Sequence, residues 1–179
     1  MKISITILLT VVALVALSFV GLKVFDYVVT DRPLQNVLKA DTRNQSVKAS
    51  AHFDGWFSTS TLVFDVTDVS GASRADVFRS FLQYTEVMQN RHFTTVILSC
   101  RGTNKFTLDG DYFQQLGQEY STQNPIYTMR TFPTHVTAMD GTQPYSEYSG
   151  GIFAVLQKEM EQFINLNDEW YAKDLEVTL

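Results

Sequence analysis

The chain has 179 residues, 45% of them apolar, and 14 basic against 19 acidic side chains give a net charge of −5. This length and composition predict one domain with a packed core and argue against a largely disordered chain. The acidic balance disfavours nucleic acid and anionic lipid headgroups as partners, and the single cysteine, Cys100, excludes an intrachain disulfide and a multi-cysteine metal site.

The N-terminal segment contains an uninterrupted apolar run from Ile3 to Leu22. Twenty helical residues span about 30 Å, which is the thickness of the hydrocarbon core of a bilayer. The run therefore predicts a single-pass membrane anchor or signal-anchor over residues 1–25, in contact with the lipid bilayer through residues 3–22. A cleaved signal peptide is the alternative, because small residues stand at 16–18, but the apolar run continues past that point.

Two signals disagree about the side of the membrane on which the domain lies. More basic residues follow the apolar run than precede it, so the positive-inside rule favours a cytoplasmic domain. The short Met-Lys start is instead typical of a bacterial signal-anchor, which exports the rest of the chain. We favour export, which predicts an extracytoplasmic domain on the inner membrane, in the cell envelope.

Residues 26–50 are predicted to be a juxtamembrane linker, followed by a globular domain over residues 51–179. Within the linker a short helix is expected, with Asp31 as its cap, Pro33 in its first turn, and Leu34, Val37 and Leu38 on one face. The polar stretch 41–50 reads as extended chain.

The domain begins with the pattern of a βαβ unit. Residues 60–71 read as a strand, 73–90 as a helix with Ser73 and Asp76 forming a capping-box start, and 93–100 as a buried strand. A short strand is then predicted over 104–110, a helix over 111–121, another strand over 126–132, and a loop over 138–151. We therefore predict an α/β (or α+β) fold with about four strands.

The last predicted element is the strongest helix of the domain, over 152–175. Its expected apolar stripe is Phe153, Leu156, Met160, Phe163, Ile164, Trp170 and Tyr171. Asn167 falls on that stripe and is interpreted either as a flank position near the solvated end or as a contact with a partner or ligand. The stripe also suggests a protein partner or self-association through this helix.

Polar residues at the expected carboxyl ends of the parallel strands form the first candidate site. Asp65, Asp68 and Ser70 follow one strand, and Arg101 follows the next, at the edge where open α/β sheets bind ligands. Spaced carboxylates and hydroxyls suit a hard cation such as Mg²⁺. Two spacings typical of metal-binding loops at strand ends are Asp-x-Ser-x-Ser and Asp-x-Asp, and this stretch differs from each by one position. A turn that caps the following helix is the simpler interpretation. Cys100 is more readily a buried side chain than a nucleophile.

A second candidate lies between two prolines, where Tyr127, Arg130 and His135 interleave aromatic and basic groups. Such a segment suits a recognition groove, because aromatic residues and Arg are enriched at binding sites. An edge strand whose prolines block further pairing is the alternative.

Two functions remain open from these residues. The first is a non-catalytic binding or interaction module, anchored in the membrane of the cell envelope, without a cofactor or metal. The second is a membrane-anchored, metal-assisted hydrolase that uses Asp65, Asp68 and Arg101. We favour the first, since no complete catalytic constellation is visible in the sequence.

Overall fold

The computed structural model describes residues 5–55 and 57–176. The strands are β1 (Lys48–Phe53), β2 (Thr61–Asp68), β3 (Thr95–Cys100), β4 (Thr103–Asp109) and β5 (Val136–Ala138). The helices are α1 (Ile5–Asp26), α2 (Arg32–Ala40), α3 (Arg74–Met88), α4 (Gly110–Glu119), α5 (Pro125–Thr131) and α6 (Ile152–Asn167). Short π-helical segments follow α1 (Tyr27–Asp31) and α6 (Asp168–Ala172), and 3₁₀ turns cover Thr42–Asn44 and Phe132–His135.

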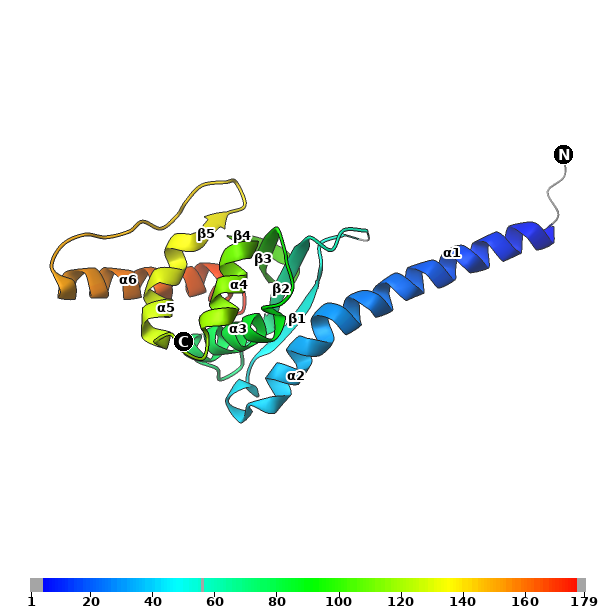
Figure 1. Cartoon of the computed structure of the whole chain (residues 1–179). Coiled ribbons are helices and arrows are strands. Elements are labelled where there is room, and N and C mark those ends of the chain that lie inside the picture. The colour runs from blue at the N-terminus through cyan, green and yellow to red at the C-terminus, as the bar shows by residue number, and fades with distance from the viewer. Residues whose placement is uncertain (1–4, 56, 177–179) are drawn as a thin grey trace.

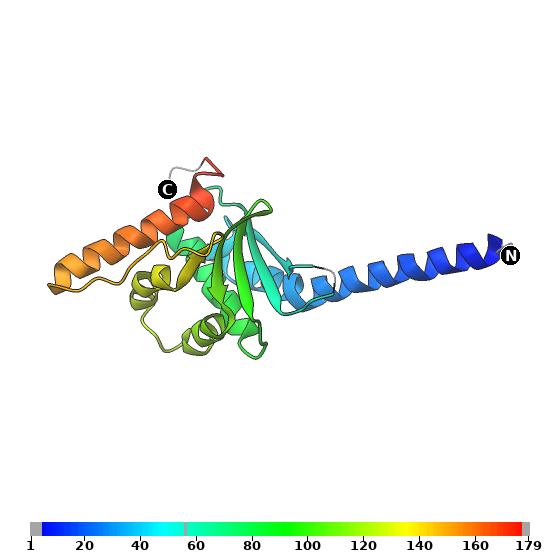
Figure 2. The same cartoon turned by 90° about the horizontal axis from the view of Figure 1, so that it is seen from above.

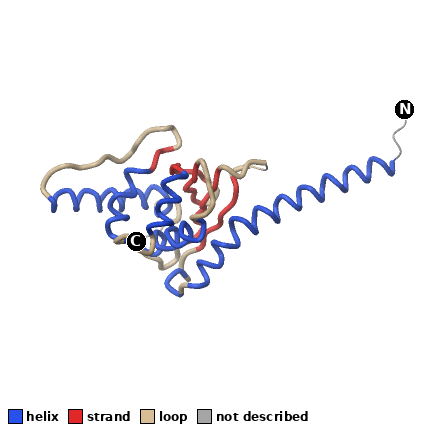
Figure 3. The backbone as a smooth tube through the Cα atoms, viewed as in Figure 1, coloured by secondary structure: helices blue, strands red, loops and turns tan. Residues whose placement is uncertain are grey.

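The strands form one mixed sheet in the order β1-β2-β3-β4-β5. β2 and β3 run parallel, and the other neighbouring pairs run antiparallel. Figures 1 and 2 show the helices of the domain gathered beside this sheet, and Figure 3 shows the strands as a single group. The α/β prediction is confirmed, with five strands where about four were expected.

The predicted βαβ unit is present as β2-α3-β3. Ser73 begins α3 with a full capping box, in which its side chain accepts from the Asp76 amide and the Asp76 carboxylate accepts from the Ser73 amide. A tight turn joins β3 to β4, with Arg101 at φ 47° and Gly102 at φ 77°. Both residues lie in the left-handed region, as the tight hairpin turn that matches strand twist requires.

The expected strand over 126–132 is wrong, because this stretch forms helix α5. Asn124 caps the helix by accepting from the Ile126 amide, and Pro125 occupies its first turn, where a missing N–H costs nothing. The fifth strand is instead the three-residue β5, which the sequence did not predict: the expected loop over 138–151 begins at its last residue.

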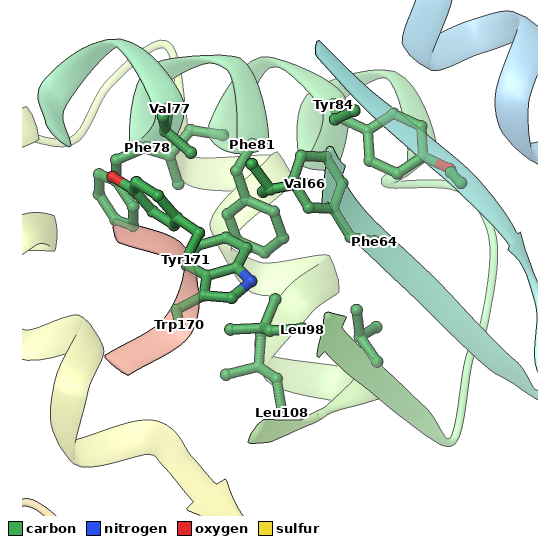
Figure 4. Packing of buried hydrophobic residues seen from close by; sticks show 14 of the residues in the cluster. Phe64, Val66, Val77, Phe78, Phe81, Tyr84, Leu98, Leu108, Trp170 and Tyr171 are labelled. Atoms are coloured by element: carbon green, nitrogen blue, oxygen red, sulfur yellow. The ribbon is translucent and has the colours of Figure 1, made fainter. Parts of the chain in front are cut away.

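The core is built from aromatic side chains of elements that lie far apart in the sequence (Figure 4). Phe64 of β2 and Phe81 of α3 meet edge to face with ring centroids 5.2 Å apart, and Phe81 lies 6.1 Å from Trp170. All three side chains are fully buried. The indole Nε1 of Trp170 also donates to the carbonyl of Ser99, at 3.0 Å, so the chain after α6 is tied to β3.

α6 projects from the domain, and its ends differ in exposure (Figure 2). Phe163 is buried in the core, whereas Phe153, expected on the same buried stripe, is 84% exposed. Asn167 does not lie at a solvated end: it is buried, donates to the carbonyl of Phe163 and accepts from the hydroxyl of Tyr171. These hydrogen bonds satisfy an amide that would otherwise be costly to bury.

The N-terminal helix enters the domain without a break. α1 passes through the π-helical segment into α2, whose Leu34, Val37 and Leu38 are buried as expected. Asp31 does not cap α2, because it lies within continuous helix. The segment 26–50, expected as a linker, is therefore packed on the domain up to the start of β1.

A row of side chains from this helix binds the free edge of β1. Unpaired edge strands invite aggregation, and covering them is a common remedy. The four side chains and their backbone partners are Asp26 with the Phe53 amide (2.9 Å), Thr30 with the Ala51 carbonyl (2.9 Å), Asp31 with the Ala51 amide (3.0 Å) and Gln35 with the Ala49 carbonyl (2.9 Å). We call this row the edge clamp.

Among the residues that the structure describes, one helix is long and apolar enough to cross a membrane, and it lies near the N-terminus. Its apolar side chains are exposed along most of α1, including Leu14 (59%) and Leu17 (67%). A signal sequence near the N-terminus meets the same criteria of length and composition.

Candidate functional site

A cavity of about 370 Å³ lies between α4, α5, α6 and the loop that precedes α6. Tyr127, Arg130 and His135, predicted from their sequence pattern as one group, all line it. The helical form of α5 brings Tyr127 and Arg130 to the same side, because residues three apart share a helix face. His135 follows in the 3₁₀ turn after α5.

Arg130 is held by a carboxylate that the sequence did not connect to it. Its Nε and Nη2 lie 2.7 and 2.6 Å from one carboxylate oxygen of Glu159 on α6. Both side chains are at least three-quarters buried, with exposed fractions of 25% for Arg130 and 16% for Glu159. This ion pair joins α5 to α6 across one end of the cavity.

His135 is stacked on Tyr112 of α4. The ring centroids lie 3.8 Å apart and the ring planes are almost parallel, at 3°. The Nδ1 of His135 lies 3.0 Å from the carbonyl oxygen of Thr131, which can only accept, so Nδ1 carries the proton. Burial raises the pKa of the Tyr112 hydroxyl, which therefore stays neutral near pH 7.

The walls of the cavity carry more negative than positive charge. Glu119, Glu147 and Glu159 line it, against the single guanidinium of Arg130. Tyr127 and Tyr148 add aromatic surface, and Tyr148 is about one-third exposed. The ammonium of Lys158 already lies over the Tyr148 ring, 4.9 Å from its centroid. The half-exposed ring of Tyr127 therefore offers the more open π-face to an organic cation, which the field of the carboxylates also attracts.

Asp65, Asp68, Ser70 and Arg101 lie where the sequence placed them, at the carboxyl ends of β2 and β3, and none of them lines the cavity. Both carboxylate oxygens of Asp65 accept from the Gly102 amide, at 3.1 and 3.0 Å. Arg101 donates from Nε to the carbonyl of Thr67, at 3.3 Å.

Asp68 and Ser70 form a turn, as the simpler interpretation held. Asp68 pairs with Lys48 at 2.7 Å and accepts from the Ser70 hydroxyl at 2.7 Å. These partners, Lys48 first, lower the pKa of the Asp68 carboxyl to about 2. Within residues 5–55 and 57–176, no group of three His, Cys, Asp or Glu side chains could hold a metal ion.

Cys100 is fully buried at the end of β3. Burial raises the pKa of its thiol to about 11, and the nearby carboxylates of Asp174 and Asp65 act in the same direction. The reactive thiolate is therefore rare at neutral pH, as expected of a packing cysteine.

The sequence reading missed the acidic and aromatic residues that complete the cavity: Tyr112, Glu119, Glu147, Tyr148 and Glu159. A signal for two of them was present, since Tyr112 and Glu119 are seven residues apart and so share a helix face. The others come from the loop and from α6, and their place at the cavity depends on long-range packing. No protein-family model, curated protein or solved structure matches the chain.

Proposed function

We propose that this protein is a membrane-anchored, non-catalytic binding module whose cavity takes a small organic cation. The observation that carries the proposal is the cavity between α4, α5 and α6, where three carboxylates and three tyrosines gather around one Arg. Its volume, about 370 Å³, suits a small ligand. The Nδ1 of His135 lies closer to the Thr131 carbonyl, at 3.0 Å, than to the Thr134 hydroxyl, at 3.4 Å, and this contact supports binding rather than activation of the hydroxyl.

The anchor is α1, which would contact the lipid bilayer through residues 3–22. A basic residue, Lys2, stands before the apolar run, as in signal-anchors, and it supports an extracytoplasmic domain on the inner membrane, in the cell envelope. On that side the cavity would meet small solutes outside the cytoplasm.

The hydrolase alternative finds less support. It needs Asp65, Asp68 and Arg101 to act on one substrate, yet the first two are engaged by a backbone amide and by Lys48. Asp68 and Ser70 serve the turn between β2 and α3. Binding of a ligand in the cavity between α4, α5 and α6 leaves the interactions of Asp65, Asp68 and Ser70 intact.

The cation proposal is tested with choline and with its uncharged carbon analogue, 3,3-dimethylbutan-1-ol, on the full chain in detergent. We expect choline-like cations to raise the melting temperature and the uncharged analogue to have no effect. Glu147→Gln removes one exposed carboxylate from the cavity wall and should weaken cation binding about fivefold, or about 1 kcal/mol.

Glu161→Gln is the matched control, because Glu161 is exposed on α6 and does not line the cavity. It makes the same change in net charge and should leave binding unchanged. An equal loss of choline affinity in both variants would show that the net charge of the protein, rather than the cavity, determines binding, and this would contradict the proposal. Equal binding of choline and the uncharged alcohol would also contradict it.

A second role is favoured by the projecting end of α6, where Ile152 is 75% and Phe153 is 84% exposed. We propose that this end binds a protein partner, which could be a second copy of the chain, because exposed apolar groups of this size are typical of interfaces. Light scattering of the full chain in detergent should show a dimer that Phe153→Ser dissociates. A monomer mass at all concentrations would contradict self-association.

A further inference from the structure

The described part of the loop between β1 and β2, residues 54–55 and 57–60, lies beside the end of α1. The edge clamp sets this position: Gln35, Asp31 and Asp26 bind Ala49, Ala51 and Phe53 in turn, so β1 runs antiparallel to the helix. The strand therefore leads the loop back along α1, towards the membrane end. Figures 1 and 2 both show the β1–β2 connection alongside α1.

The contacts agree with this direction. The rings of Phe53 and Phe25 stack with their centroids 6.2 Å apart. Beyond them, Phe57, Ser58 and Thr59 share a cavity of about 140 Å³ with Leu22 and Lys23 of α1. Leu22 is the last residue of the apolar run, so the loop reaches the level at which the predicted membrane span ends.

Phe57 is 86% exposed at this level. A Phe side chain is more stable when it is buried in an apolar environment than when it is left in water. The neighbouring surface of the helix is also apolar, since Val24 is 56% and Phe25 is 50% exposed. Phe57 thus extends the exposed apolar surface of the helix onto the domain.

We propose that the β1–β2 loop is a second membrane contact, in which Phe57 inserts into the boundary between lipid headgroups and acyl chains. The proposal rests on the membrane anchoring proposed above. In segments that lie at a membrane surface, Phe, Trp and Leu side chains bury at this boundary. Lipid is the occupant because the loop continues the surface of the helix that would cross the membrane.

The rest of the loop limits how deep it enters. Ser58, Thr59 and Ser60 are polar and exposed, and an irregular loop cannot satisfy its backbone groups within the hydrocarbon region. The backbone therefore stays among the headgroups while the Phe57 ring points inward. The clamp and the loop together would hold the domain against the membrane at a defined angle.

The test uses the full chain in phosphatidylcholine vesicles. The variant Ser58→Cys carries an environment-sensitive fluorophore on its new thiol. This site keeps Phe57, and the native Cys100 stays unlabelled because it is buried and the pKa of its thiol is about 11. Quenching by lipids that carry a spin label near the headgroup is then measured. Ser149→Cys, exposed in the loop before α6, is the remote control, and Leu14→Cys in α1 reports insertion of the helix.

We expect quenching at position 58 to be several-fold greater than at position 149, and to fall to the level of position 149 when Phe57→Ser is added. Quenching at position 14 by lipids labelled deep in the acyl chain, without quenching at position 58, would overturn the loop contact and leave the anchor standing. No quenching at position 14 would overturn the anchor itself, and with it this proposal. Quenching at position 58 that Phe57→Ser does not reduce would contradict the role of Phe57.

Discussion

Replacing Trp170 with Ala should lower the free energy of unfolding by about 3–5 kcal/mol. The side chain is fully buried and packs against Phe64 and Phe81, so its removal leaves a large cavity in the aromatic core. The same change removes the hydrogen bond to the Ser99 carbonyl and leaves that buried acceptor without its partner. Denaturant unfolding of the full chain in detergent, followed by near-UV circular dichroism, measures the effect.

Phe153→Ala is the matched control for this prediction. Both residues were expected on one buried stripe of the C-terminal helix, but Phe153 is 84% exposed. Its truncation should change the free energy of unfolding by less than about 0.5 kcal/mol, measured at a concentration that keeps the chain monomeric. Similar losses in the two variants would contradict the exposed position of the start of α6 and the buried position of the π-helical segment that follows it.

Gly117→Ala should destabilise the domain by about 3 kcal/mol, although Ala favours helix over Gly by about 1 kcal/mol. Gly117 lies in α4 where this helix meets the end of α3. A Cβ at this position would overlap the carbonyl oxygen of Thr85 and lie 3.0 Å from the Cβ of Gln89. Backbone atoms cannot rotate away, so α4 must move from α3.

The displacement should also reach the cavity, because Leu116 and Glu119 of α4 line it. We therefore expect weaker choline binding together with a lower melting temperature. Gly151→Ala is the control, since no atom lies within 4 Å of a Cβ there and its φ is −67°. A stable Gly117→Ala variant with unchanged binding would contradict the close packing of α3 on α4.

The candidate cavity was partly visible in the sequence. Tyr127, Arg130 and His135 were grouped because they are close in the chain, and all three line one cavity, but Tyr127 and Arg130 were expected in a strand. The stretch contains aromatic and β-branched residues, which favour strands, and also Asn124-Pro125, which begins helices. The structure resolves this conflict through packing: Thr128 is buried and Arg130 pairs with Glu159 on α6.

The polar residues at the carboxyl ends of β2 and β3 lie near one another as expected, but they do not line the candidate cavity. The strand order was read well enough to place Asp65, Asp68 and Arg101 at one edge of the sheet. Their partners, however, are a backbone amide, Lys48 and a backbone carbonyl. The polar side chains that suggested a ligand site at this edge instead stabilise turns. A pattern of polar residues alone does not distinguish a turn from a ligand site.

The sequence by itself determined the features that depend on neighbouring residues. These are the apolar span of the N-terminal helix, the capping box of α3 and the strand-helix-strand order of the βαβ unit. Each follows from hydrogen bonds or periodicities within a few turns of chain.

The tertiary structure alone decided what depends on distant residues. It joined the N-terminal helix to β1 through the edge clamp, brought Glu159 to Arg130, and stacked Tyr112 on His135. It also buried Trp170 and left Phe153 exposed, although both lie on one apolar stripe. A helix pattern records which side chains share a face, but only the packing of other elements determines how much of that face is covered.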